Sequence, residues 1–331
     1  MKTINDRKWN ALAEGETGCT EPRTITESDM VTFACITGDF SRLHMDREFS
    51  LEKKMPGRVV HGMLGASYVV GMISHQTPVL VGRSVSNVIL SAFEFNHKHV
   101  VLLNDTIHCC WKISRVNKST NSQVISIEVA IKILNQEGAI VGIGSFEAKK
   151  VDASFLLLNG DNNSEDVWPV SYLDPDPKVY YLDDYYPNGQ EGSTEARTLT
   201  QTDIVNYCGL TADYNPIYVD KSFSDETVLE QALVPPLLVF NIYFASWLRQ
   251  WMQIDMPNDS FAGHISDQIK VFGPVFVGDT LHARFQTLDV RQSKSKPNMG
   301  ILTFGIQVVN QHSQVVQFAK VLMMYPAKPQ E

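Results

Sequence analysis

The chain of 331 residues has a formal net charge of −9 at pH 7 and no cluster of basic residues, which argues against a nucleic-acid-binding protein. Its longest apolar runs, residues 62–73 and 233–248, are short or interrupted by Pro235, Pro236 and Asn241, so membrane-spanning helices are not expected. The length corresponds to about two domains, each able to bury its own core.

Cysteine usage and the N-terminal residues bear on the cellular compartment. The cysteines are odd in number, include one adjacent pair and show no C-x-x-C spacing, which predicts reduced thiols and no cysteine metal site. A charged, polar stretch follows Met1, so no secretory signal is expected. We therefore predict a cytoplasmic protein. The cysteines are Cys19, Cys35, Cys109, Cys110 and Cys208.

The first predicted element is a short amphipathic helix. Thr26 and Asp29 fit an S/T-x-x-D capping box, in which the two side chains satisfy free backbone N–H groups at a helix start. Met30, Phe33 and Ala34 follow at i, i+3 and i+4 spacing, which predicts one buried face. This helix leads into a loop that carries Asp39.

A second helix and a hairpin follow. Residues 62 to about 75 are apolar on nearly every face, so this helix is stable only when other structure surrounds it. Residues 123–134 alternate between apolar and polar, and a turn at 135–138 precedes another apolar strand, which predicts an antiparallel hairpin. A sheet wrapped around a long central helix is the hot-dog architecture.

The same order of elements recurs 174 residues later. Thr200 and Asp203 occupy the positions of the first capping box, residues 237–251 form a second apolar helix, and residues 302–308 alternate again. We predict an α+β double hot-dog fold with domains at 1–151 and 180–331. The connector at 152–179 is rich in Asp, Asn, Pro and Gly, and residues 180–185 resemble the entry strand of the second domain.

The two copies differ where chemistry would occur. The offset places Tyr218 at the position of His44 and Pro236 at that of Gly62. A phenol with a pKa near 10 replaces an imidazole poorly at neutral pH, and proline has no backbone N–H to donate. The second half is therefore predicted to be catalytically silent, with one site per chain in the first half.

Residues 25–46 and 57–64 resemble the MaoC-like, (R)-specific enoyl-CoA hydratase family, whose pattern reads roughly F-A-x-x-[ST]-G-D-x-N-P-x-H-x-D and then V-H-G-M-L. The resemblance implies that Asp39 and His44 are the hydratase pair and that Gly62 donates its N–H to the thioester oxygen. It also implies an acyl-CoA or acyl-carrier-protein substrate. CoA or phosphopantetheine would then carry the substrate, and no separate cofactor is expected.

Residues around this pair are predicted to contact substrate: Ser41, Arg42, His61 and Met63. Ser41 and Arg42 replace the family's N-P, which removes proline's fixed φ and adds a cation beside the site. Arg42 either faces an anionic group of the substrate or its carrier, or is a solvated surface residue. His61 is interpreted mainly as orienting the loop before the central helix.

The sequence also bears on metal binding and on alternative functions. His97 and His99 share a strand face at i, i+2, but no third ligand is in register, so packing or exposure is favoured and no metal is predicted.

Hydration and dehydration are the same reaction in opposite directions, and the sequence leaves the direction open. A non-catalytic acyl-thioester binding or scaffold protein and a hot-dog thioesterase are the alternatives. Two halves in one chain predict an intramolecular pseudo-dimer, with further homodimerisation left open, and neither nucleic acid nor membrane as partner.

Overall fold

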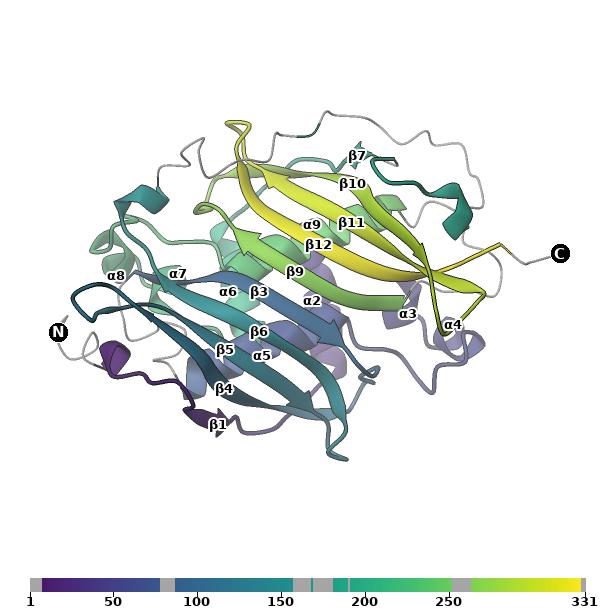
Figure 1. Ribbon diagram of the computed structural model, residues 1–331, viewed down its shortest axis with the longest axis horizontal. Coiled ribbons are helices and arrows are strands. Elements are labelled where there is room, and N and C mark those ends of the chain that lie inside the picture. The colour runs from purple at the N-terminus through teal and green to yellow at the C-terminus, as the bar shows by residue number, and fades with distance from the viewer. Residues whose placement is uncertain are drawn as a thin grey trace.

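The computed structural model describes residues 8–77, 87–156, 168, 181–189, 191–251 and 263–328. Its main strands form one continuous antiparallel sheet in the order β1-β4-β5-β6-β3-β9-β12-β11-β10-β7. The central helices lie together on one side of this sheet (Figure 1). This is the α+β double hot-dog fold predicted from the repeated pattern.

The first half contains two short N-terminal strands, a helical segment and then the four main strands of its part of the sheet. Its elements are β1 Thr17–Cys19, β2 Arg23–Thr24, α2 Glu27–Thr37, α3 Arg42–Met45, α4 Arg47–Glu52, α5 Gly62–Gln76, β3 Val88–His97, β4 Thr106–Lys118, β5 Val124–Leu134, β6 Ile140–Lys150 and η1 Ala153–Phe155.

The second half repeats this order with its own central helix, α9. Its elements are η2 Leu182–Asp184, β7 Gly192–Ser193, β8 Arg197–Thr198, α6 Gln201–Thr211, α7 Pro216–Val219, α8 Lys221–Asp225, α9 Pro236–Trp251, β9 Gly263–Val271, β10 Thr280–Gln292, β11 Met299–Val309 and β12 Val315–Pro326.

Both predicted capping boxes are confirmed. The Thr26 side chain accepts a hydrogen bond from the Asp29 N–H, and the Asp29 carboxylate accepts one from the Thr26 N–H at 2.7 Å. Thr200 and Asp203 form the same pair at the start of α6. These caps satisfy N–H groups that a helix start leaves free. They therefore fix where α2 and α6 begin.

The two central helices are buried as their composition predicts. Every residue of α5 from Met63 to Ser74 is buried, and α9 is buried along most of its length. Strands of both halves supply the surrounding apolar side chains, including Phe93, Phe146 and Phe304. One core therefore runs through both halves, because the sheet is continuous and the helices pack beneath it.

The two halves join across a local pseudo-twofold axis. Strands β3 and β9 pair antiparallel, and Glu94 faces Gln268, its own equivalent in the repeat because 268 − 94 = 174. On the central helices, Asn241 Nδ2 donates to Ser67 Oγ at 2.9 Å, and these residues are also 174 positions apart. Contact between equivalent residues is the mark of an isologous, twofold interface. The chain is thus an intramolecular pseudo-dimer, whereas further homodimerisation stays a prediction.

The prediction of reduced thiols is wrong for two cysteines. Strand β1 pairs with β4 so that Cys19 lies directly opposite Cys110, and the two form a disulfide across a sequence separation of 91 residues. Spacing along the chain does not reveal such a pair, because strand pairing creates it. Cys35, Cys109 and Cys208 are free. The expectation of a cytoplasmic location loses its support from the cysteines and stays a prediction.

The predicted entry strand of the second domain is also wrong over its described part. Residues 182–184 form the 3₁₀ turn η2, because the Asp184 carboxylate accepts a hydrogen bond from the Tyr181 N–H at 2.9 Å and closes a tight turn. Most of the predicted connector at 152–179 lies outside the described residues. In the part of the chain that is described, no helix is long and apolar enough to cross a membrane.

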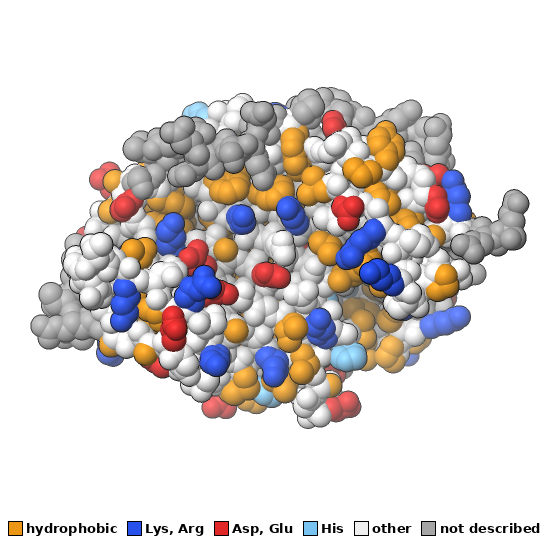
Figure 2. Space-filling model, viewed as in Figure 1, with side chains coloured by type: hydrophobic (Ala, Val, Ile, Leu, Met, Phe, Trp, Pro, Cys, Tyr) orange, Lys and Arg blue, Asp and Glu red, His pale blue; other side chains and the backbone are white. Residues whose placement is uncertain are grey.

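On the face shown in Figure 2, Lys and Arg side chains alternate with Asp and Glu over the outer surface of the sheet. Neither sign of charge forms a continuous patch on this face. Near the junction of the halves the surface is hollowed, with hydrophobic side chains inside the hollow and basic side chains at its edge (Figure 2).

Candidate active site

The loop after α2 carries the first candidate group. Helix α2 ends at Gly38, whose φ of 83° is in the left-handed region that favours glycine. Two arginines of the second half hold this turn. Arg249 Nη1 donates to the Gly38 carbonyl at 2.9 Å, and Arg197 Nη1 donates to the Ile36 carbonyl at 3.1 Å. The backbone that leads to Asp39 is therefore fixed from the other half of the chain.

Asp39 is a buried carboxylate that remains ionised. Its side chain is 5% exposed and accepts hydrogen bonds from the Ser41 N–H at 3.1 Å and from the Ser41 hydroxyl. Burial raises the pKa of Asp39, but His44, His61 and the Ser41 hydrogen bonds outweigh it, so the pKa lies below its ordinary value. A carboxylate held in this state can accept a proton or orient a water molecule.

His44 is presented by the short helix α3 with its protonation pattern fixed. Its Nδ1 lies 2.7 Å from the main-chain carbonyl oxygen of Val59. Because a carbonyl oxygen only accepts, Nδ1 carries the proton and donates it, and in the neutral ring Nε2 is left with a free lone pair. The imidazole of His44 is thereby oriented as a base.

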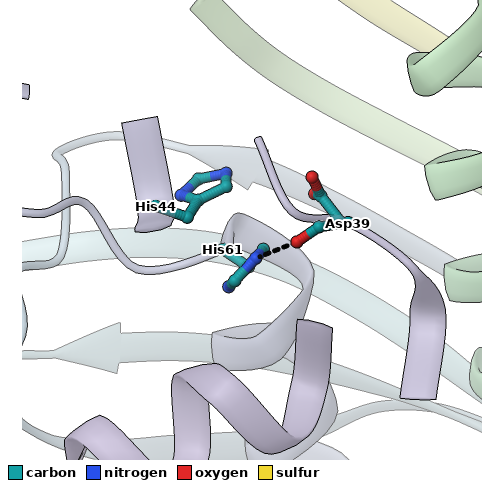
Figure 3. Close-up of side chains that lie close together, drawn as sticks. All are labelled: Asp39, His44 and His61. Carbon is teal, nitrogen blue, oxygen red and sulfur yellow. Dashed lines mark hydrogen bonds between the residues drawn. The ribbon is translucent and has the colours of Figure 1, made fainter. Parts of the chain in front are cut away.

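His61 supports the same loop from beneath. It is 2% exposed, and its Nε2 donates to the main-chain carbonyl oxygen of Asp39 at 2.9 Å (Figure 3). Its ring packs against His44 at 4.0 Å and Phe33 at 5.0 Å between centroids. Burial, followed by the nearby charge of His44, lowers the pKa of His61 to about 3. His61 is thus a neutral side chain, in keeping with an orienting role.

Asp39, His44 and His61 converge on one small volume. One carboxylate oxygen of Asp39 and one ring nitrogen of each histidine all lie within 4.8 Å of one another. The His44 ring stands beside the Asp39 loop, and the His61 ring lies under both (Figure 3). This separation between the carboxylate and the imidazole allows one water molecule to contact both groups.

Gly62 begins α5 immediately after His61. No hydrogen bond joins its N–H to another described residue, as expected for the first residue of a helix. A Cβ at this position would lie 2.5 Å from Cε1 of His97, so only glycine fits beneath that imidazole. His97 therefore lies beside Gly62, the candidate N–H donor. Its predicted position on a strand did not indicate this contact. The sequence carried one usable signal, a histidine where the repeat has Val271.

The structure gives less direct support to the other predicted substrate contacts. Arg42 is 64% exposed, pairs with Asp46 at 2.8 Å and lies over the Phe49 ring at 4.2 Å. Met63 is 2% exposed and packs in the core. These contacts favour the surface interpretation of Arg42. The predicted substrate roles of Ser41, Arg42 and Met63 stay predictions.

The equivalent place in the second half keeps a buried carboxylate, Asp213, but lacks the histidine. Tyr218 is fully buried, which raises its pKa well above that of a free phenol and keeps the hydroxyl neutral. Pro236 begins α9 and lines a small pocket together with Val271, the residue equivalent to His97. This position therefore offers neither an imidazole nor a free N–H, and the silence of this half stays a prediction.

Comparison with known proteins places this arrangement in a family. The model for the MaoC like domain matches residues 10–136 and 187–310, which is more than half of the chain. The first match contains Asp39, His44 and Gly62. The second contains the equivalent positions, so both halves derive from the same domain.

Curated relatives match parts of the chain. The 3-hydroxyacyl-[acyl-carrier-protein] dehydratase FERN of Solanum lycopersicum is 30% identical over 102 residues, which are 31% of this chain and 57% of that protein. The (R)-specific enoyl-CoA hydratase of Rhodospirillum rubrum is 27% identical over 105 residues, 32% of this chain and 67% of that protein. Protein MaoC of Klebsiella aerogenes is 36% identical over 81 residues, 24% of each chain. The matches to MaoC and FERN thus span about a quarter and just over half of those proteins.

Solved structures match over nearly the full length. A MaoC domain protein from Chloroflexus aurantiacus superposes with a TM-score of 0.74 at 15% identity and covers 97% of both chains. A Mycobacterium tuberculosis protein described as having a double hotdog fold gives a TM-score of 0.71 at 14% identity, covering 96% of this chain and 98% of that chain. At this identity the likeness establishes the fold alone.

Proposed function

Because this chain belongs to the MaoC-like hydratase and dehydratase family, we propose that it is an (R)-specific enoyl-thioester hydratase, or a 3-hydroxyacyl-thioester dehydratase in the reverse direction. The observation that carries the proposal is the convergence of an ionised carboxylate, Asp39, and an imidazole with a free Nε2, His44, in the half that also has a free helix N–H at Gly62. The substrate would be an acyl-CoA or acyl-carrier-protein thioester.

The pair supplies both proton transfers of hydration. Water held between Asp39 and His44 loses a proton to His44 Nε2 as its oxygen bonds to C3 of the enoyl group. The same proton then passes to C2, so that H and OH are added to one face of the double bond. Asp39 orients the water and stabilises the transient imidazolium, since burial strengthens their electrostatic attraction. Dehydration follows the same steps in reverse.

Gly62 would stabilise the charge that develops on the thioester oxygen. When C3 is attacked, negative charge moves to this oxygen, and the free N–H at the start of α5 lies at the positive end of the helix dipole. One preorganised donor of this kind lowers the barrier by roughly 3 to 4 kcal/mol. The absence of a side chain at Gly62 makes room for the His97 ring beside this N–H.

Two relatives support the reaction class, one named for dehydration and the other for hydration. The tomato protein is named a 3-hydroxyacyl-acyl-carrier-protein dehydratase and the Rhodospirillum rubrum protein an (R)-specific enoyl-CoA hydratase. Both names describe water leaving or joining the same carbons of an acyl thioester. A thioesterase or a non-catalytic binding protein would use the same fold, so the experiment must distinguish all three.

The test is an activity panel on the purified full chain. Enoyl-CoA and 3-hydroxyacyl-CoA thioesters of increasing length are assayed for loss or gain of the conjugated double bond, and thiol release is measured in parallel. Asp39→Asn and His44→Ala should each lower turnover by roughly two or more powers of ten. Tyr218→Phe, at the position equivalent to His44, is the matched control and should retain activity. Thiol release without hydration would show a thioesterase, and binding without either reaction would show a non-catalytic protein.

A further inference from the structure

A second group of chemically active side chains lies at the junction of the two halves. His97 is the last residue of β3, and His264 and Asp267 are in β9, the strand paired with β3. One ring nitrogen from each histidine and one carboxylate oxygen lie within 4.8 Å of one another. The cluster is built from both halves, so the strand pairing itself assembles it.

Asp267 is the unusual member of this cluster. Its side chain is 0% exposed, and its carboxylate accepts from His264 Nε2 at 2.8 Å and His97 Nε2 at 3.4 Å. Among the described residues, no Lys or Arg forms an ion pair with it. A buried carboxylate is costly unless a positive charge compensates it. A bound cation would supply that charge.

The fold does not require this polar cluster. Positions related to it by the 174-residue offset hold Val271 for His97, Leu90 for His264 and Phe93 for Asp267. The pseudo-symmetric side of the same junction is therefore apolar, and Leu90 and Phe93 pack in the core there. Replacement of buried ionic groups by well-packed apolar ones is often neutral or stabilising. The cluster thus calls for an explanation other than strand pairing.

The donor set matches one class of ligand. Two imidazole nitrogens and one carboxylate oxygen are the ligands typical of Zn²⁺ and neighbouring divalent transition metals, and three protein ligands leave coordination positions open. The side chains of His97 and His264 are 16% and 18% exposed, so an ion can reach them. We propose that His97, His264 and Asp267 form a binding site for a divalent transition metal ion such as Zn²⁺.

This proposal is independent of the hydratase proposal, because binding is measured directly. The full chain is freed of metal with a chelator, and ZnCl₂ is titrated by calorimetry. Co²⁺ is then added as a coloured substitute whose absorption reports imidazole ligands. One Zn²⁺ per chain is expected to bind to the parent protein. His264→Gln and Asp267→Asn should each weaken binding by at least about 100-fold, beyond the range seen when only supporting residues change.

Two control variants make the result specific. His99→Gln removes an exposed histidine two residues from His97, and His44→Gln removes one from the other His-Asp group. Both should still bind one Zn²⁺. Circular dichroism and thermal unfolding identify any variant that fails to fold, and His264→Gln keeps the test decisive should Asp267→Asn not fold. The proposal is overturned if the parent does not bind stoichiometrically, if His264→Gln binds as the parent does, or if His44→Gln abolishes binding.

Discussion

The buried His61 should make the protein less stable in mild acid. Its folded-state pKa of about 3 lies below the value near 6.5 of an unfolded histidine, because burial and the charge of His44 oppose its protonation. Between these two pKa values the unfolded chain binds a proton at this histidine, whereas the folded chain does not. The contribution of His61 to stability is therefore complete above pH 6.5 and is lost progressively as the pH falls toward 3.

The size of this effect follows from the pKa difference. One pKa unit corresponds to about 1.36 kcal/mol, so the full difference is on the order of 5 kcal/mol. A fall from pH 6.5 to 4.5 costs about 2.3 kcal/mol, because the unfolded histidine is already half protonated at pH 6.5. Asp39 stays ionised in this window, because its own pKa lies below its ordinary value. The window therefore isolates the histidine from the carboxylate beside it.

The variant His61→Gln tests the reasoning. Glutamine cannot titrate, and its amide N–H can still donate to the Asp39 carbonyl that His61 now contacts. Urea unfolding at several pH values between 7.5 and 4.5, followed by two spectroscopic probes, gives the free energy of unfolding of each protein. The variant should lose about 2.3 kcal/mol less than the parent between pH 6.5 and 4.5. His99→Gln, the exposed control, should follow the parent, and parallel curves for parent and His61→Gln would refute the argument.

Three further predictions follow from close contacts. Gly71→Ala would place a Cβ 1.9 Å from a main-chain oxygen of α6 and should lower the free energy of unfolding by about 3 kcal/mol. Gly65→Ala, on the same helix, is the control: its Cβ would meet nothing within 4 Å, so the variant should not be destabilised. Gly62→Pro should abolish turnover in any background, but Gly62→Ala should regain activity when His97→Ala makes room, since only the alanine keeps the N–H. Arg249→Met should lower kcat about tenfold with little change in KM or melting temperature, because its contact outside its own helix is with the turn before Asp39. Equal effects on KM and kcat would contradict this.

The elements with strong local signals could be predicted from the sequence. The capping boxes at Thr26 and Thr200 are confirmed because the cap and its partner are three residues apart and need no tertiary structure. The helix from Gly62 is confirmed because its uniform apolar character permits only a buried position. The hot-dog fold follows from these elements, since a helix that is apolar all round requires a sheet to cover it.

Contacts between distant strands could not be predicted in the same way. The Cys19–Cys110 disulfide depends on the register of β1 against β4, which no local pattern specifies. His97 illustrates the same limit at the candidate site. Its predicted strand partner, His99, lies beyond the end of β3, and the titratable groups that meet His97 come from β9 in the other half. A search for ligands within one repeat cannot find them.

The second half lacks the histidine and the helix N–H of the candidate site, yet it contacts that site in the first half. Its arginines hold the turn before the Asp39 loop, and its strand β9 places His264 beside the imidazole that borders Gly62. Duplication makes this division of roles possible, because once two equivalent domains share one chain, each can change without altering the other. Contact across the pseudo-twofold axis persists at Ser67 and Asn241, whereas His44, Gly62 and His97 are replaced by Tyr218, Pro236 and Val271 in the second half. The half that lacks the histidine and the helix N–H therefore supplies contacts across the junction that hold the candidate site of the other half.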